Sequence, residues 1–231
     1  MDAWIAKLFE RPDLARMGHA QRRGDANLGL GWLYYALGRI VRPRHAVVIG
    51  SYRGFVPMML GKALADNRDG GEVVFIDPSL VDPFWADPAE VAGYFREHGL
   101  DNVRHYRATT QEFVETDAYR AIEEVGILFI DGLHTDEQVA FDWGAFARLV
   151  PPRGFIALHD SMVVLPDGVY GPGKAYEMRV KFFVDRLKTD PDLQVMDWPF
   201  GHSGLTLVRK IDRSLPDPLR DWIEGHPLDA V

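Results

Sequence analysis

Five short apolar runs, separated by longer amphipathic stretches, constrain the fold of this chain more than any other feature. The runs cover residues 46–49, 73–76, 103–106, 127–130 and 155–158. Because such runs offer apolar side chains to both faces of a sheet, they are typical of central parallel strands that helices cover on either side. Each strand–helix–strand unit is then a right-handed crossover, and the sequence predicts an α/β fold with a doubly covered parallel sheet.

Two further segments flank this alternating region. Before it, apolar residues recur at helical spacing up to about Ile40, and Arg42-Pro43 interrupts the pattern. We therefore expect a helical N-terminal extension over residues 1–42 and assign residues 43–231 to the main domain. After the fifth run, two strand-like stretches (193–197 and 205–209) are joined by a segment rich in turn residues, which predicts an antiparallel terminal hairpin. A short helix at 219–223 is expected to follow.

The composition excludes several classes of protein. The 231 residues include 26 Lys and Arg against 34 Asp and Glu, for a net charge of -8, and no cysteine. An acidic chain with neither clustered basic residues nor an apolar run of about 18 residues argues against nucleic acid or a membrane as a partner. Without cysteine the chain has no disulfide, thiolate nucleophile or Cys-ligated zinc, which fits a reducing cytoplasm. We expect a cytoplasmic protein that acts on a small molecule.

The residues that directly follow the five runs point to a ligand site, because ligands bind beyond the carboxyl ends of strands in an open parallel sheet. These segments are Gly50-Ser-Tyr-Arg-Gly54, Asp77-Pro78, Arg107-Ala-Thr-Thr110, Asp131-Gly-Leu-His134 and His159-Asp-Ser161. Glycines after the first strand allow a tight turn and a close approach to a ligand, and an acid after the second strand can accept hydrogen bonds from ribose hydroxyls. Singly, an ordinary turn and a turn cap explain these residues equally well, but their order favours an adenosine-like ligand.

Carboxylates and imidazoles follow the fourth and fifth runs. Asp131 and the pair His159-Asp160 end strands that are expected to be neighbours, so their side chains could converge on one hard cation. His134 could act as a general base, because the unperturbed pKa of histidine lies near neutrality. A turn residue, a core-edge histidine and a residue at a helix start are the structural alternatives for Asp131, His159 and His134. Together the four residues favour a functional site.

Residues 166–173 contain three glycines and two prolines, with Tyr170 as the only large side chain. This composition predicts a loop without regular helix or strand. We expect the loop to cover the acceptor side of the site, and a solvated connector is the alternative.

Four segments resemble the class I S-adenosylmethionine-dependent methyltransferases: Ile49-Gly-Ser-Tyr-Arg-Gly54, Ile76-Asp-Pro78, Phe129-Ile-Asp-Gly-Leu-His134 and Pro152-Arg-Gly-Phe-Ile-Ala-Leu-His-Asp160. The resemblance spans roughly residues 45–210. Within this class, the segments are most similar to those of the small-molecule O-methyltransferases related to the macrolide-sugar, catechol and cephalosporin-modifying enzymes. It implies a Rossmann-like, seven-stranded, mostly parallel sheet with helices on both faces and an antiparallel last strand.

The resemblance also implies roles for individual residues. The cofactor S-adenosyl-L-methionine would be bound by Gly50, Ser51, Gly54, Asp77, Thr110 and Gln111, with Asp77 on the ribose and the last two near adenine. A divalent metal such as Mg²⁺ would be held by Asp131, His159 and Asp160. Two positions depart from the pattern: Val48 replaces an acid that many relatives carry before the first loop, and His159 replaces a carboxylate.

The implied activity is methyl transfer to a hydroxyl of a small metabolite, such as a sugar or phenol of secondary metabolism. Asp131 with a bound cation would orient the hydroxyl, and His134 would take its proton. Two alternatives stay open: a metal-independent enzyme that uses His134 and His159, and an accessory protein that binds the cofactor without catalysis. The aromatic cluster at 32–35 suits either core or dimer packing, so the N-terminal helices could join copies in a homo-oligomer.

Overall fold

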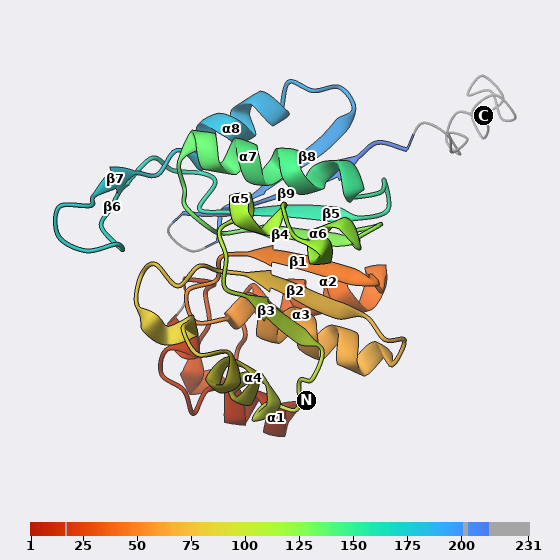
Figure 1. The fold of residues 1–231 in the computed structure, drawn as a ribbon, viewed down its shortest axis with the longest axis vertical. Helices are drawn as coiled ribbons and strands as arrows, with labels where there is room; N and C mark the ends of the chain where they lie inside the picture. The colour runs from red at the N-terminus through yellow and green to blue at the C-terminus, as the bar shows by residue number, and fades with distance from the viewer. Residues whose placement is uncertain (17, 201–202, 213–231) are drawn as a thin grey trace, which may run out of the picture.

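Seven strands form one sheet in the order β3-β2-β1-β4-β5-β9-β8 (Figure 1). The computed structural model describes residues 1–16, 18–200 and 203–212, so the helix expected at 219–223 lies outside the described residues. The strands are β1 (His45–Ile49), β2 (Glu72–Ile76), β3 (Val103–Tyr106), β4 (Ile127–Ile130), β5 (Phe155–His159), β8 (Leu193–Trp198) and β9 (Leu205–Lys210). The first five correspond to the five apolar runs and pair in parallel. The predicted α/β class is confirmed.

The end of the sheet is antiparallel. β9 lies between β5 and β8 and pairs antiparallel with both, with Leu158 opposite Thr206 and Val195 opposite Val208. The predicted terminal hairpin and the antiparallel last strand implied by the resemblance are therefore confirmed.

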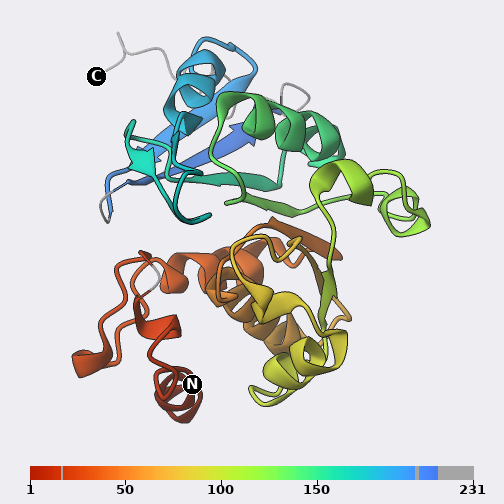
Figure 2. The same cartoon turned by 60° about the vertical axis from the view of Figure 1, so that its left-hand side comes forward.

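Helices cover both faces of the sheet (Figures 1 and 2). One face carries α1 (Asp2–Leu8), α2 (Gly31–Val41), α3 (Phe55–Asn67) and α4 (Pro88–Arg96), and the other carries α5 (Thr110–Phe113), α6 (Asp117–Arg120), α7 (Asp136–Phe146) and α8 (Val180–Leu187). Ala46 and Val48 of β1 pack into the first layer, whereas Val47 and Ile49 pack into the second. This alternation explains why the central runs are apolar at every position. Among the described helices, none is both long and apolar enough to cross a membrane.

The N-terminal region differs from a continuous helical extension. α1 and α2 are separated by the 3-10 turns η1 (Leu14–Arg16) and η2 (Arg23–Asp25), and Ile40 is 74% exposed although the periodicity placed it on the apolar side. α2 ends where expected: Arg42 adopts a left-handed conformation with φ 51°, and the proline that follows cannot extend a helix. α1 contributes buried residues to the same core as the sheet. The division of the chain at residue 42 stays a prediction.

A short hairpin projects beyond the carboxyl ends of the strands (Figure 2). It consists of β6 (Pro166–Asp167) and β7 (Tyr176–Glu177), which pair antiparallel. The expectation that 166–173 contains no strand is therefore wrong at its first two residues. Pro166 can occupy this edge position because no ladder bond requires its missing N–H. The rest of the segment forms the tip of the hairpin. Two further 3-10 turns, η3 (Pro83–Trp85) and η4 (Ala147–Leu149), complete the fold.

Candidate active site

A cleft of about 800 Å³ opens at the carboxyl ends of β1, β2, β4 and β5. Parallel pairing brings these four strand ends to one edge of the sheet, so residues far apart in the sequence share the cleft. Its wall contains nine of the ten predicted site residues: Gly50, Ser51, Asp77, Thr110, Gln111, Asp131, His134, His159 and Asp160. The tenth, Gly54, begins α3 beneath the Trp85 indole and is not part of the wall.

The turn after β1 requires glycine. Gly50 has φ +69°, and a Cβ there would lie 2.4 Å from the carbonyl oxygen of Asp131. Gly54 has φ +82°, and a Cβ there would lie 2.9 Å from Trp85. Both positions combine a left-handed backbone with a close neighbour, so no other residue fits them without strain. Beside them, the Ser51 hydroxyl is buried in the cleft wall and has no hydrogen-bond partner among the residues that the structure describes, which leaves it available to a ligand.

Asp77 stands directly after β2, the strand next to β1 in the sheet. Its Oδ1 accepts a hydrogen bond from the Ser79 amide at 2.8 Å. Burial raises the pKa of this carboxyl to about 6, although backbone amides of Ser79 and Ser51 act in the opposite direction. Part of the carboxylate thus stabilises the local turn, and no side chain among the described residues donates a hydrogen bond to it.

Thr110 and Gln111 begin α5, directly after β3 and its connecting loop. Thr109 caps this helix: its side chain accepts from the Glu112 amide, and the Glu112 side chain accepts from the Thr109 amide. This capping box fixes the first turn. The loop after β3 carries the start of α5 back toward α7, the helix that follows β4, where the Gln111 amide nitrogen donates to Gln138 (Figure 1).

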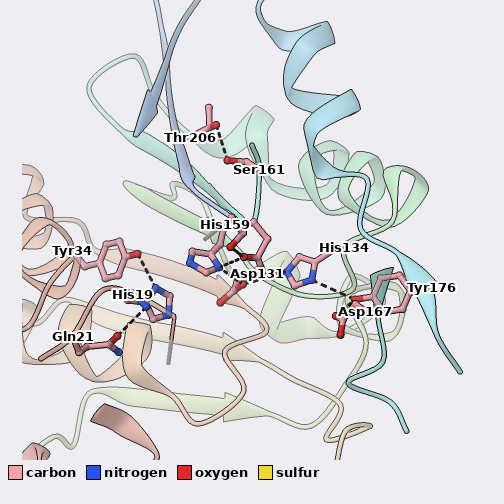
Figure 3. A network of polar contacts seen from close by, with 12 residues as sticks. His19, Gln21, Tyr34, Asp131, His134, His159, Ser161, Asp167, Tyr176 and Thr206 are labelled. Atoms are coloured by element: carbon pink, nitrogen blue, oxygen red, sulfur yellow. Dashed lines mark hydrogen bonds and ion pairs between the residues drawn. The ribbon is translucent and has the colours of Figure 1, made fainter. Parts of the chain in front are cut away.

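Two carboxylates and two imidazoles meet at the ends of β4 and β5 (Figure 3). Nε2 of His134 lies 3.4 Å from Oδ1 of Asp131 and 3.2 Å from Oδ2 of Asp160. Nδ1 of His159 lies 3.1 Å from Oδ1 of Asp131 and 3.3 Å from Oδ1 of Asp160, but neither contact has the geometry of a hydrogen bond. Asp160 adopts a left-handed backbone with φ 53°, a strained conformation that orients its side chain at the site.

The four groups shift each other's pKa. Burial alone would raise the pKa of Asp131, but the charge of His159 and the contact with His134 hold it well below its usual range. For Asp160 the same histidines outweigh burial and also lower the pKa. Burial would lower the pKa of His159, but Asp131 and Asp160 raise it to about 10. The pKa of His134 is raised for the same reason. Without another cation, the cluster is a buried pair of ion pairs.

The cluster could also hold a metal ion. Ligand atoms of Asp131, His134 and Asp160 lie within 4.8 Å of one another. The predicted set contained His159 in place of His134, and the structure places both imidazoles against both carboxylates. The unsatisfied Nδ1 of His159 and the two carboxylates are a donor set that suits a divalent cation.

Several residues of the site were not found by sequence reasoning. His19 enters the cleft from the N-terminal segment, with Nδ1 3.1 Å from the Tyr34 hydroxyl. The Tyr176 hydroxyl of the hairpin donates to Oδ2 of Asp167 at 2.9 Å and lies 3.4 Å from Nδ1 of His134 (Figure 3). Neither His19 nor Tyr176 follows a sheet strand of the cleft, so no sequence signal marked them.

Tyr170, expected to cover the acceptor side, lines the cleft together with Val169 and Lys174 of the hairpin tip. Its ring lies 5.9 Å from that of Tyr176. Burial raises the pKa of its phenol, and the charges of Asp77 and Asp167 raise it further. The hairpin tip is therefore part of the cleft wall, and its role toward the acceptor stays a prediction.

Comparison with known proteins identifies a methyltransferase domain and supports the fold. Residues 47–161 match a family described as a methyltransferase domain. The O-methyltransferase TomG from Streptomyces achromogenes, involved in tomaymycin synthesis and solved with S-adenosylmethionine, shares 20% identity at a TM-score of 0.60, over 92% of this chain and 91% of its own. An O-methyltransferase from Bacillus cereus, solved with S-adenosylhomocysteine, shares 15% identity at a TM-score of 0.64, over 91% and 92% of the two chains.

A methyltransferase from Podospora anserina, also bound to S-adenosylhomocysteine, shares 18% identity at a TM-score of 0.57, over 92% of this chain and 89% of its own. At these identities the likeness concerns the fold, and the family match covers the strands that carry the cleft. Residues 47–161 thus form a methyltransferase domain, in a fold shared with methyltransferases solved with S-adenosylmethionine or S-adenosylhomocysteine.

Proposed function

We propose that this enzyme transfers a methyl group from S-adenosylmethionine to a hydroxyl of a small metabolite. The observation that carries the proposal is the division of one cleft into two halves. The glycine turn after β1 and Asp77 suit a nucleoside, whereas Asp131, His134 and Asp160 suit the removal of a proton from a hydroxyl. The O-methyltransferases from Streptomyces achromogenes and Bacillus cereus support oxygen as the acceptor atom.

The residues of the first half fit the cofactor. Gly50 and Ser51 would lie against its methionine end, since no side chain fits at Gly50 and the buried Ser51 hydroxyl lacks a partner. Asp77 would accept from the ribose hydroxyls, and Thr110 with Gln111 would lie at the adenine. The sulfonium of the cofactor supplies an activated methyl group. The protein then has to align the acceptor oxygen with that methyl group and take its proton.

We propose that Asp131 and Asp160 hold a divalent cation together with an imidazole. Carboxylates suit Mg²⁺ and Mn²⁺, and an imidazole ligand makes Mn²⁺ worth testing beside Mg²⁺. A cation there would lower the pKa of an acceptor hydroxyl. With His159 as the third ligand, His134 is free to act as the base. Tyr176, hydrogen-bonded to Asp167, would hold the His134 ring through its Nδ1.

A metal-independent reaction is the second candidate, and one observation favours it. The two imidazoles already face the two carboxylates at 3.1 to 3.4 Å, so the carboxylates can stabilise the imidazolium that forms when a histidine takes a proton. In that case His134 or His159, in its neutral form, takes the proton directly. The remaining alternative, suggested by Val48, is an accessory protein that binds the cofactor without catalysis. The absence of turnover would distinguish it from the metal-dependent and the metal-independent enzyme.

We further propose a small-molecule acceptor, and neither nucleic acid nor membrane, for an enzyme of the cytoplasm. The net charge of -8 supports this choice. On α2, Trp32 is 41% and Ile40 is 74% exposed, which supports a homo-oligomer through the N-terminal helices.

Calorimetry with S-adenosylhomocysteine tests the cofactor half first, and saturable one-to-one binding is expected. Transfer of a radiolabelled methyl group to a panel of sugars and phenols then tests the acceptor half, with protein treated with EDTA and with protein resupplied with Mg²⁺ or Mn²⁺. Labelled products that release their label as methyl iodide on ether cleavage with hydroiodic acid would support oxygen as the acceptor. Lack of binding would contradict the cofactor assignment, and binding without any product would favour the accessory role.

A further inference from the structure

Three polar side chains form a hydrogen-bonded row where the start of α5 meets α7 in the cleft wall. The Gln111 amide nitrogen donates to Oε1 of Gln138 at 2.8 Å, and the Gln138 amide nitrogen donates to Oδ1 of Asp142 at 2.8 Å. Gln111 stands on α5, whereas Gln138 and Asp142 stand one turn apart on α7. All three residues line the cleft, and neither the resemblance nor the acidic cluster gives a role to Gln138 or Asp142.

The inner end of the row fixes its direction. Asp142 is fully buried, and an ionised carboxylate can only accept hydrogen bonds. Gln138 must therefore turn its NH₂ group toward Asp142 and its oxygen outward. Gln111 must in turn give its NH₂ group to that oxygen, which leaves Oε1 of Gln111 as the free end of the row. An amide side chain by itself has no such preference, because its two ends are nearly equal in shape.

The outer end of the row stands where the base of the cofactor would lie. Asp77 after β2, Ala108 after β3 and Gln111 at the start of α5 line the same cleft. A nucleoside whose ribose contacts Asp77 can therefore reach the start of α5 with its base. Gln111 is exposed at this rim of the cleft, so its free oxygen is accessible to a ligand.

We infer that Asp142, acting through Gln138, orients Gln111 so that its oxygen accepts a hydrogen bond from the 6-amino group of adenine, and that the row thereby selects adenine over a 6-oxopurine. This inference rests on the proposed binding of S-adenosylmethionine. Asp142 and Gln138 are positioning residues, because they reach the base only through Gln111. A 6-oxo group would place an acceptor against the fixed oxygen of Gln111, and this mismatch is what gives selectivity.

A purely structural role for Asp142 would have different consequences. Its carboxyl also lies beside the Thr110 hydroxyl, and burial raises its pKa to about 6 while Thr110 and Gln138 act against that rise. If Asp142 only tied α5 to α7, its loss would weaken the binding of every purine nucleoside to the same degree. If it sets the direction of the row, its loss would change the preference between two purines.

The test compares the dissociation constants of S-adenosylhomocysteine and S-inosylhomocysteine, which differ at position 6 of the purine, by calorimetry at pH 8. We expect the wild-type protein to prefer the adenosyl ligand by about tenfold or more. In Asp142→Asn an amide at the inner end can donate or accept, so the row loses its fixed direction. We expect the preference to fall below about threefold, with the affinity for the inosyl ligand unchanged or improved. Gln138→Leu, which breaks the row at its centre, should have the same effect.

A double variant provides the decisive control. A carboxylate at position 111 can only accept, whatever its neighbours do, so Gln111→Glu added to Asp142→Asn should restore the preference for the adenosyl ligand. Equal loss of affinity for both ligands in both single variants, with no rescue, would overturn the inference and leave the proposed function intact. Equal binding of both ligands by the wild-type protein would also overturn the inference and leave the proposed function intact. Failure of wild-type protein to bind S-adenosylhomocysteine would overturn the proposed function and the inference together.

Discussion

The imidazole of His19 packs against the imidazole of His159, with ring centroids 4.4 Å apart (Figure 3). His19 also stacks on Phe55 at 5.2 Å, and the Tyr34 hydroxyl lies 3.1 Å from its Nδ1. Burial and the neighbouring charge of His159 lower the pKa of His19 to about 3, so its ring is neutral. A residue of the N-terminal segment therefore forms part of the wall that orients a strand-end histidine, and this region belongs to the site.

His19→Ala should lower turnover by about tenfold or more, since a misplacement of about 1 Å at a reacting group can cost two orders of magnitude. Affinity for S-adenosylhomocysteine should stay within about threefold, because His19 lies away from the nucleoside half. Thermal unfolding should also show a loss of about 1–3 kcal/mol for this buried ring. His98→Ala, which removes another buried histidine far from the cleft, should lose stability without the loss of turnover. Equal turnover in the two variants would contradict the role of His19.

Asp77→Ala should weaken the binding of S-adenosylhomocysteine by about 100-fold at pH 8, because hydrogen bonds to a charged acceptor contribute about 1.5–3 kcal/mol each. The fold should persist, since Asp77 lies in a turn after β2 and contributes no side chain to the core. Calorimetry measures the affinity. Glu72→Gln, at the opposite end of the same strand, should bind like wild type, and an unchanged affinity for Asp77→Ala would mean that the nucleoside lies elsewhere.

The affinity for S-adenosylhomocysteine should also depend on pH. Burial raises the pKa of Asp77 to about 6, and ribose hydroxyls bind best to the ionised carboxylate. Affinity should therefore be constant above about pH 7 and fall by up to about tenfold per pH unit below 6, as protons compete with the ligand. Asp142 titrates in the same range, so Asp77→Asn serves as the comparison. A slope that persists in Asp77→Asn would assign the effect to another group.

Asp160→Asn should weaken the binding of Mn²⁺ by about 100-fold or more while leaving S-adenosylhomocysteine affinity unchanged, because the carboxylate is a proposed metal ligand and would stand apart from the nucleoside. Asparagine tolerates the left-handed backbone at this position, and so the fold should survive. Calorimetry or the electron paramagnetic resonance of free Mn²⁺ reports the binding, with Asp185→Asn on the exposed face of α8 as the control. Full activity of EDTA-treated wild-type enzyme would instead support the metal-independent reaction.

Tyr170→Ala should raise the acceptor KM and also weaken the binding of S-adenosylhomocysteine by about threefold to tenfold, because the hairpin tip lines the same cleft as Asp77. Steady-state kinetics and calorimetry separate the two effects. Leu165→Ala, which changes an exposed side chain at the base of the same hairpin, should leave both values unchanged. Wild-type values for Tyr170→Ala would reduce the hairpin to a solvated connector.

Sequence alone located the strands and the residues that follow them. An apolar run on both faces requires a covered central strand, and parallel pairing carries the ends of such strands to one edge, so Gly50, Asp77, Asp131 and Asp160 could be assigned to one cleft before any contact was known. The glycine positions were equally legible, since a tight turn against a neighbouring backbone excludes a Cβ.

The tertiary structure decided which side chains complete the site. The site includes His19 from a loop, Tyr176 from a hairpin and Asp142 from the middle of a helix. Neither hydrophobic periodicity nor a position after a strand of the cleft marks these residues in the sequence. It also decided that both imidazoles face both carboxylates, which a list of strand ends leaves open. Hydrophobic periodicity depends on residues that are close in the sequence. The contacts of the site join segments that are far apart in the sequence, so no local pattern reveals them. Only the packing of the layers could bring them together.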